Sequence, residues 1–154
     1  MMNTYSSLIF SNEVFWTVAS AWLTASLLKV VFYSIQKKKI NFRRLIGNGG
    51  MPSTHSASVV SLAVAVGFKE GWDSTALAIS LVLAIIVMID ASGVRLAASK
   101  HAKALNEITE EVFKDGQFHY EKFNELLGHT QAQVFVGGSI GLIVSLIFFN
   151  FIWL

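Results

Sequence analysis

The sequence contains no cysteine, which excludes disulfides, thiolate nucleophiles and zinc–thiolate sites. Charged residues are scarce as well: they make up 14% of the 154 residues, whereas soluble domains carry about 25%. The net charge of +2 is too small to indicate binding to nucleic acid. By contrast, 53% of the residues are hydrophobic and the mean hydropathy is +0.55. This composition indicates an integral membrane protein.

Long apolar runs predict four membrane-spanning helices, over residues 14–35, 52–68, 74–89 and 131–154, because a span needs about 20 mainly apolar residues. Residues 93–127 are polar, and we expect them to form a helical insertion between the third and fourth spans. Lys29, near the end of the first span, is expected to extend its charged end to the water. The predicted fold class is all-α, an integral membrane helical bundle that forms one domain over residues 1–154.

The stretch Gly49–Ala57 combines the features of an anion site. Its two glycines allow unusual backbone angles, and Pro52, the only proline in the chain, suits the first turn of a helix. Ser53 and Thr54 can cap that helix or leave their N–H groups facing a ligand. A helix N-terminus binds anions readily, and His55 can exchange a proton there. The alternative is a glycine turn that caps a membrane helix beside an incidental histidine.

Charged residues lie on both sides of this stretch in the sequence. A basic segment precedes it, comprising Lys37, Lys38, Lys39, Arg43 and Arg44. That segment is either a positive-inside anchor or an anion clamp, and the two roles are compatible. Asp90 is expected to end the third span, with Arg95 close behind it. The two form either a structural ion pair or part of a site, since charges at membrane helix ends are functional by default.

Two helical faces are candidates for packing. Residues at heptad-like steps of four and three are Val94, Ala98, His101, Leu105, Ile108 and Val112. We interpret them as a packing face rather than as the setting of a catalytic His101. Gly137 and Gly141 form a GxxxG pair, which we expect to pack against another helix of the same chain. Any homo-oligomer would use the Gly137/Gly141 face or the helix over residues 94–112.

Four spans place segments 37–55 and 90–129 on one side of the membrane. Of the twelve Lys and Arg residues, ten lie on that side, Lys69 lies opposite and Lys29 lies within a span. The positive-inside rule therefore predicts a multi-pass plasma-membrane protein with this side cytoplasmic and both termini outside. The converging cations, helix N-terminus, His55 and His129 suit a phosphate group. One histidine could attack phosphorus while the other protonates the leaving oxygen, with no metal and no cofactor.

Three segments resemble the type-2 phosphatidic acid phosphatase superfamily, which includes bacterial acid phosphatases and vanadium haloperoxidases, and more closely its divergent membrane branch. They are Gly-Gly-Met-Pro-Ser-Thr-His-Ser-Ala at 49–57, Asp-Ala-Ser-Gly-Val-Arg at 90–95 and Gly-His-Thr-Gln-Ala-Gln-Val at 128–134. In the first superfamily motif, a lysine is followed after six residues by Arg-Pro. Lys37 and Arg44 match that spacing, although Leu45 replaces the proline, and Lys39 and Arg43 are alternatives. In the second motif, the resemblance implies that Ser53 binds phosphate and His55 is the general acid, with Thr54 in place of the usual glycine.

The third superfamily motif, an arginine, five residues, a nucleophilic histidine, three residues and an aspartate, fits this chain in two ways. Arg95 and His101 match its first half, but Leu105 falls at the position of the acid. His129 and Gln133 match its second half, with glutamine in place of the acid. By resemblance we favour Arg95 as a phosphate ligand and His129 as the nucleophile, with Gln133 as its partner. Asp90 is the acid that could stand in for the missing carboxylate.

The sequence thus predicts a membrane phosphatase that hydrolyses a lipid phosphate or diphosphate through a phosphohistidine intermediate, with a membrane lipid as its partner. Gln133 argues against full activity, because a neutral amide stabilises an imidazolium only weakly. In a serine protease triad, the same acid-to-amide change lowers turnover about ten-thousand-fold. The rival hypothesis is a non-catalytic protein that binds or translocates phospholipids or anions. A third is a purely structural membrane bundle.

Overall fold

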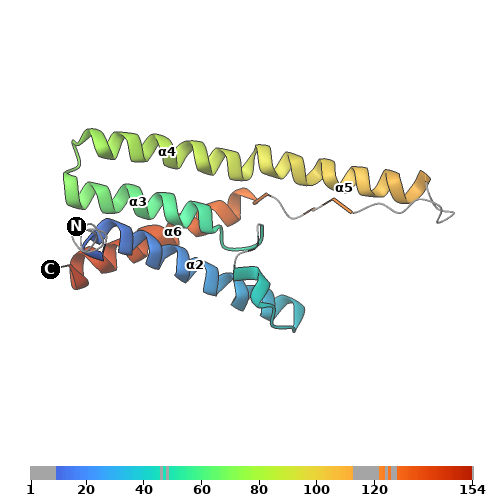
Figure 1. The fold of residues 1–154 in the computed structure, drawn as a ribbon, viewed down its shortest axis with the longest axis horizontal. Helices are drawn as coiled ribbons and strands as arrows, with labels where there is room; N and C mark the ends of the chain where they lie inside the picture. The colour runs from blue at the N-terminus through green and yellow to red at the C-terminus, as the bar shows by residue number, and fades with distance from the viewer. Residues whose placement is uncertain are drawn as a thin grey trace, which may run out of the picture.

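The computed structural model describes residues 10–45, 47, 49–112, 122–123, 125 and 128–153. Within these residues every regular element is helical (Figure 1), which confirms the all-α class. In chain order the elements are α2 (Glu13–Lys37), the 3₁₀ turn η1 (Phe42–Leu45), α3 (Thr54–Glu70), α4 (Thr75–Ser92), α5 (Val94–Val112), α6 (Gln131–Ile147) and the π-helical turn η2 (Phe148–Ile152).

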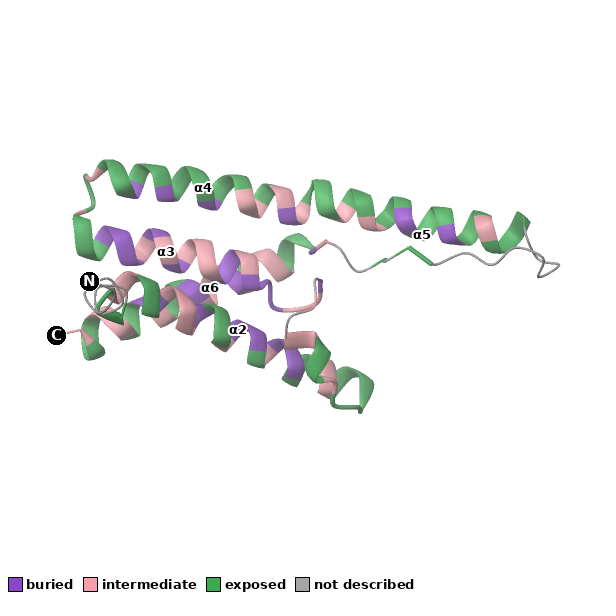
Figure 2. Cartoon of the chain, viewed as in Figure 1, coloured by how far each residue is buried: buried purple, intermediate pink, exposed green. Residues whose placement is uncertain are grey.

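The four helices of the bundle, α2, α3, α4 and α6, differ in length and in how much of their surface is buried. Among the described residues, three segments are long and apolar enough to cross a membrane: Glu13–Lys37, Thr75–Val112 and Gln131–Ile152. Helix α3 has 17 residues and is therefore about 26 Å long at 1.5 Å per residue. It packs against α2, α4 and α6, and it carries much of the buried surface of the bundle (Figure 2). The second predicted span is thus the central helix of the bundle.

Helices α3 and α6 touch at their backbones. A Cβ added at Gly137 would lie 2.2 Å from the Ser53 carbonyl oxygen, and one added at Gly141 would lie 2.2 Å from the Ala57 carbonyl oxygen. Further along, the hydroxyls of Ser61 and Ser145 are 2.9 Å apart and both side chains are buried. The glycine face therefore packs within the chain, as expected. It is not free for a second copy, which corrects its inclusion among the oligomer faces.

Helices α4 and α5 form one long rod (Figure 1). The third helix does not end at Asp90 as the sequence predicts, because helical hydrogen bonding continues through Gly93. The Gly93 N–H donates to the Ile89 carbonyl at 2.7 Å, and the Ala97 N–H donates to the Gly93 carbonyl at 2.9 Å. The polar insertion is therefore helical over α5, which extends beyond the bundle.

The chain returns along the rod in a non-helical conformation at Lys122, Phe123 and Glu125. The helical conformation expected for the insertion over residues 93–127 is therefore absent at these three residues, and residues 113–121, 124, 126 and 127 lie outside the described part. The side-chain amide of Asn106 explains the extended backbone, since it exchanges two hydrogen bonds of 3.0 Å with the backbone of Phe123. The Asn106 side chain thus pairs with the Phe123 N–H and carbonyl, which in a helix would pair with other backbone groups.

The bundle brings distant segments together at one end. The turn before α3, the α4–α5 junction and the start of α6 lie at the same end, whereas both termini lie at the opposite end (Figure 1). Two backbone hydrogen bonds join these segments directly. The Ser53 N–H donates to the Gln133 carbonyl at 3.1 Å, and the His129 N–H donates to the Ala91 carbonyl at 2.9 Å.

Candidate active site

A glycine turn delivers the start of α3 into the bundle. Gly49 and Gly50 have φ values of 71° and 84°, the left-handed region that favours glycine. Ser53 then caps α3: its hydroxyl oxygen accepts hydrogen bonds from the Ser56 N–H at 3.3 Å and the Ser56 hydroxyl at 3.0 Å. Because Ser53 is fully buried and accepts both bonds, its own O–H remains available to donate. Thr54 is buried beside it.

His129 is held from several directions just before α6. Its side chain is 0% exposed, and a Cβ added at the preceding Gly128 would lie 2.3 Å from the Leu96 backbone nitrogen, so the chain passes directly against the α4–α5 junction. The His129 Nδ1 lies 3.0 Å from the Gly50 carbonyl oxygen and 3.3 Å from Gln133 Oε1. The turn before α3 and the first turn of α6 therefore fix the imidazole together.

The hydrogen bonds around Gln133 determine the tautomer of His129. Gln133 Oε1 accepts the Thr130 N–H at 3.1 Å, as part of a capping box in which the Thr130 hydroxyl accepts the Gln133 N–H. A backbone N–H can only donate, so the atom of Gln133 that faces it must be the carbonyl oxygen. His129 Nδ1 consequently faces two acceptors, carries the proton and donates to both. Nε2 is left with a free lone pair.

A second histidine lies beside the His129 ring. The ring centroids of His55 and His129 are 5.9 Å apart, with the rings inclined at 65°. Among the described residues, His129 Nε2 and His55 Nδ1 are buried nitrogens without a hydrogen-bond partner. Unpartnered buried polar atoms are uncommon and require an explanation. Two such nitrogens on neighbouring imidazole rings indicate a site for a polar ligand.

Lys29 is a cation at this site that the sequence analysis missed. Its side chain is 2% exposed, so the expectation that it reaches the water is wrong. Its Nζ donates to the Gly47 carbonyl at 3.1 Å, and its charge acts on both His55 and His129. With Arg44 and Gly50, Lys29 lines a cavity of about 350 Å³.

The predicted basic segment divides into an inner and an outer part. Arg44 is half-buried, and its guanidinium lies 4.7 Å from the centre of the Tyr33 ring. Lys37, Lys39 and Arg43 are exposed, although Lys37 reaches the rim of the Lys29 cavity. The outer cations can attract an anion, whereas Arg44 and Lys29 are placed to contact one inside the protein.

Asp90 and Arg95 form an ion pair at the α4–α5 junction, with Arg95 Nε 2.5 Å from the Asp90 carboxylate. Their side chains are 37% and 45% exposed. Asp90 therefore lies against Arg95, whereas the Nδ1 of His129 is bonded to Gly50 and Gln133. Both charges act electrostatically on His55. The pair borders the histidines, with the acid positioned to hold the arginine.

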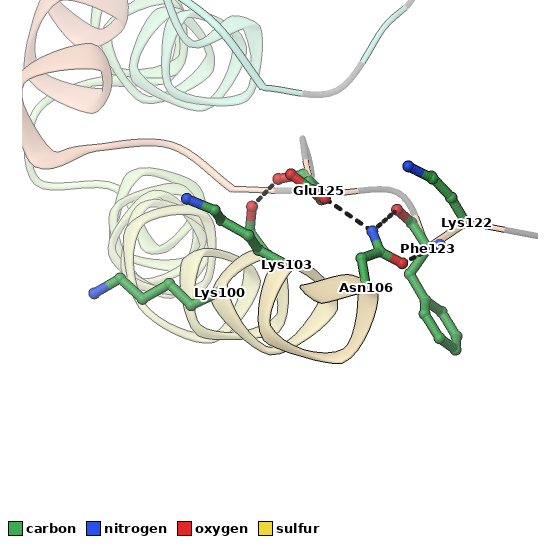
Figure 3. A pocket seen from close by; sticks show the side chains of 7 residues that line it. Lys100, Lys103, Asn106, Lys122, Phe123 and Glu125 are labelled. Carbon is green, nitrogen blue, oxygen red and sulfur yellow. Dashed lines mark hydrogen bonds between the residues drawn. The ribbon is translucent and has the colours of Figure 1, made fainter. Parts of the chain in front are cut away.

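His101, the rival histidine of the third motif, lies exposed on α5, away from this site. The same face of α5 exposes Val94, Leu105, Ile108 and Val112. A separate cavity of about 510 Å³ lies between α5 and the returning segment (Figure 3). It is lined by surface side chains that include Lys100, Lys103 and Glu125, and it holds neither histidine of the site.

The environment of His129 sets its charge. Burial lowers the pKa of His129 below its ordinary value, and the positive charges of Lys29 and His55 act in the same direction. The hydrogen bonds to Gln133 and Gly50 act in the opposite direction and are outweighed. The surroundings of His129 therefore favour its neutral imidazole.

The side chains and N–H groups at the site are suited to bind an anion rather than a metal ion. Within the described ranges, no three His, Asp or Glu side chains come together in a way that could hold a metal ion. The polar groups gathered around the histidines are two imidazoles, the buried Lys29, Arg95 and the N-terminus of α3, and Arg44 lines the adjoining Lys29 cavity. These are the groups that recognise phosphate in proteins.

Comparison with known proteins gives one matching family and one similar protein. Residues 10–144 match the sequence model of the Divergent PAP2 family. The chain is also 34% identical over 142 residues to YuiD, an uncharacterized membrane protein of Bacillus subtilis (strain 168), with 83% of this chain and 88% of that protein covered. No solved structure matches the chain. The protein is thus an integral membrane protein that belongs to the divergent PAP2 family.

Proposed function

We propose that the protein is a membrane phosphatase that hydrolyses a lipid phosphate or diphosphate through phospho-His129. The observation that carries this proposal is the state of His129: its Nδ1–H is donated to Gly50 and Gln133, its Nε2 has no hydrogen-bond partner, and the His55 ring lies beside it. A nucleophile held in one tautomer beside a second acid–base group is the arrangement that covalent catalysis requires.

In the proposed reaction, His129 Nε2 attacks phosphorus and a P–N bond forms. The P–O bond to the lipid breaks, and His55 gives a proton to the leaving oxygen. A water molecule, from which His55 takes a proton, then attacks the phosphohistidine, the P–N bond breaks and inorganic phosphate leaves. Lys29, Arg44, Arg95 and the N–H groups at the start of α3 would stabilise charge on the transferring group. No metal is needed.

The described conformation is closed to substrate. His129 has no exposed surface, and the two rings are close enough to contact each other. A phosphate group therefore needs part of the surrounding structure to move, and the Gly49–Pro52 turn and the His55 ring both lie against His129. The two left-handed glycines make the turn the more adaptable of the two walls.

Gln133 replaces the carboxylate that the resemblance leads one to expect, and it can supply only part of that function. Its oxygen and that of Gly50 fix the tautomer, so the amide does not place the proton on the wrong nitrogen. Neither acceptor carries a full negative charge, so the imidazolium that forms during the reaction is less stabilised. We therefore expect slow turnover.

We also propose that the site faces the cytoplasm of a plasma-membrane protein. Support comes from the positive-inside rule, with ten of the twelve Lys and Arg residues on the site side. Cations that bind phosphate contribute less to this argument than cations that only anchor the loops.

The second candidate function is non-catalytic binding or translocation of a phosphorylated lipid. The neutral Gln133 beside His129 favours it. The same cations and imidazoles would then hold the headgroup without breaking the P–O bond. The two functions differ in one observable, the release of phosphate.

The test is phosphate release by the detergent-purified protein from phosphatidic acid, phosphatidylglycerol phosphate, and prenyl phosphates and diphosphates. We expect His129→Ala to lower release by roughly a thousandfold or more, the matched His101→Ala to leave it unchanged, and EDTA to have no effect. Equal activity of His129→Ala would overturn the assignment. Lipid binding without any release from the folded wild type would favour the second candidate.

A further inference from the structure

An apolar groove runs along the outside of the bundle, away from the cations. It is formed by three helices and has a volume of about 560 Å³. Val60 of α3 lies at its base, Met88 and Ser92 of α4 form one side, and residues of α6 from Gln131 to Leu142 form the other. No part of the proposed reaction uses this groove.

The groove exists because α4 packs on α3 and hardly contacts α6. On α6 the groove is lined by two small residues, Gly138 and Ser139, which leave the space unfilled. A Cβ added at Gly138 would lie 3.4 Å from Val60 Cγ2, so the base of the groove is already in contact with α6. At the rim, Phe135 and Leu142 are 76% and 42% exposed, so the groove opens toward the surroundings of the bundle.

One end of the groove lies close to the backbone of His129, although neither histidine lines the groove. Ser92 follows Ala91, whose carbonyl accepts the His129 N–H. Gln131 lies two residues after His129 and begins α6. The groove is thus polar at the catalytic end and apolar along the rest of its length. From Gln131 to Leu142 it extends about 16 Å at 1.5 Å per residue.

We propose that this groove holds the hydrocarbon chain of the phosphorylated lipid while its phosphate lies at His129 and His55. This inference rests on the proposed function and adds the position of the lipid chain. An apolar groove beside membrane-spanning helices is filled by hydrocarbon rather than water, because its walls offer too few polar partners to hydrate it. The groove ends at Ser92 and Gln131, beside the backbone that holds His129, and this proximity favours the chain of the substrate over that of any other bilayer lipid.

A groove-filling substitution tests the proposal in turnover. Ser139→Phe adds a ring to the groove, and the lost Ser139 hydroxyl donates only to Phe135 of its own helix. The matched control is Ile143→Phe, one turn further along α6 at a position that is 55% exposed and outside the groove. The substrates are butyl, octyl, dodecyl and hexadecyl phosphate, together with phenyl phosphate, which has no chain.

For the wild type, we expect kcat/KM to rise with chain length. Ser139→Phe should lower kcat/KM for hexadecyl phosphate by about tenfold, the scale of size discrimination in apolar pockets, and leave phenyl phosphate unchanged. Ile143→Phe should behave as the wild type. Equal loss for all substrates, or equal loss in both variants, overturns the proposal.

A second readout does not depend on turnover. A dodecyl phosphate analogue with a photoreactive diazirine in its chain is crosslinked to the wild-type protein in phosphatidylcholine nanodiscs, and the labelled residues are mapped by mass spectrometry. We expect labels on Met88, Val134 or Leu142, displaced by excess dodecyl phosphate but not by dodecanol. Labels elsewhere, or equal displacement by dodecanol, overturn the groove proposal. Absence of phosphate release with groove labelling intact refutes only the proposed function.

Discussion

Two histidines fit the same sequence motif, yet the fold treats them differently. His129 precedes α6 and is fully buried, tied through its backbone to Ala91 and through its ring to Gly50. His101 lies on α5 and is exposed. Spacing along the chain cannot distinguish them, because neither is followed four residues later by the acid of the motif: Leu105 follows His101 and Gln133 follows His129. What separates them is whether other helices cover that face, and at α6 the backbone of α3 does so.

The largest effect is expected from separating α6 and α3. Gly137→Ala places a Cβ where the Ser53 carbonyl oxygen lies 2.2 Å away, so the two helices must move apart. We expect the free energy of unfolding to fall by about 3 kcal/mol, the upper range for overpacking. Gly138→Ala is the control, since its nearest neighbour is a side-chain methyl at 3.4 Å. Thermal unfolding in detergent measures both, and equal melting temperatures would refute the close contact.

The second largest effect is expected from replacing Gln133, four residues after His129, and is compared with the replacement of Leu105, four residues after His101. Gln133→Ala removes one acceptor of the His129 Nδ1–H and a capping-box side chain. Since Gly50 still accepts that hydrogen bond, we expect phosphate release to fall about a hundredfold, as for other orienting residues. Leu105→Ala is the equivalent change on α5 and should have no effect. If both variants lose activity equally, α5 belongs to the site.

The third effect is on the pH dependence of turnover, which should depend on His129 and not on His101. Burial lowers the pKa of His129, and attack on phosphorus needs the neutral ring. Activity should therefore persist below pH 6.5, the ordinary histidine value, and fall only as the pH drops through the lowered pKa of His129. His101→Ala should leave this acid limb in place. An acid limb at or above the ordinary histidine pKa would show that His129 is not the titrating nucleophile.

A smaller change is expected when the missing charge is restored. Gln133→Glu keeps the chain length and the oxygen near His129 Nδ1 but adds a negative charge. The carboxylate should raise the pKa of His129, which moves the acid limb to higher pH, and should increase turnover above that limb several-fold by stabilising the imidazolium. Leu105→Glu on α5 is the control and should move neither quantity. A limb that moves to lower pH would contradict the assigned contact.

The smallest effect on activity is expected on α5 itself. Asn106→Ala removes both hydrogen bonds to the Phe123 backbone. Hydrogen exchange at the Phe123 amide should accelerate by about tenfold, since a lost hydrogen bond is worth roughly 1 kcal/mol. Phosphate release should not change. A loss of activity comparable to that of Gln133→Ala would show that the returning segment shapes the site.

The overall arrangement could be predicted from the sequence because apolar runs and their connections are local properties. Four apolar runs predict four helices of alternating direction. The two polar segments are separated by two of these helices, which places both segments at the same end of the bundle. The bounds of α2 and α3 differ from the prediction by only a few residues. The end of α4 was misjudged because Asp90 and Gly93 look like a break, although backbone hydrogen bonding continues through them.

The inner part of the site was harder to predict. The position of Lys29 near the end of the first span predicts a snorkelling residue, but Lys29 continues the series Thr17, Ala21 and Ala25, whose members recur every four residues and are all buried. That small-residue face was the signal that Lys29 points inward. The Gly50 carbonyl that helps to orient His129 left no signal, because any residue type carries a carbonyl and only the fold decides what it meets.

The continuous rod of α4 and α5 also has a mechanical consequence. Thr75–Val112 spans 38 residues, or about 57 Å at 1.5 Å per residue, whereas the hydrocarbon core is about 30 Å thick. A helix of that length is longer than the hydrocarbon core is thick, so tilting it within the bilayer moves the part that extends beyond the core. His129 is bonded to it at Ala91, near the middle of the rod, and the returning chain is bonded to it again at Asn106. A load applied near Val112 would therefore tilt the rod and displace the imidazole relative to the turn before α3.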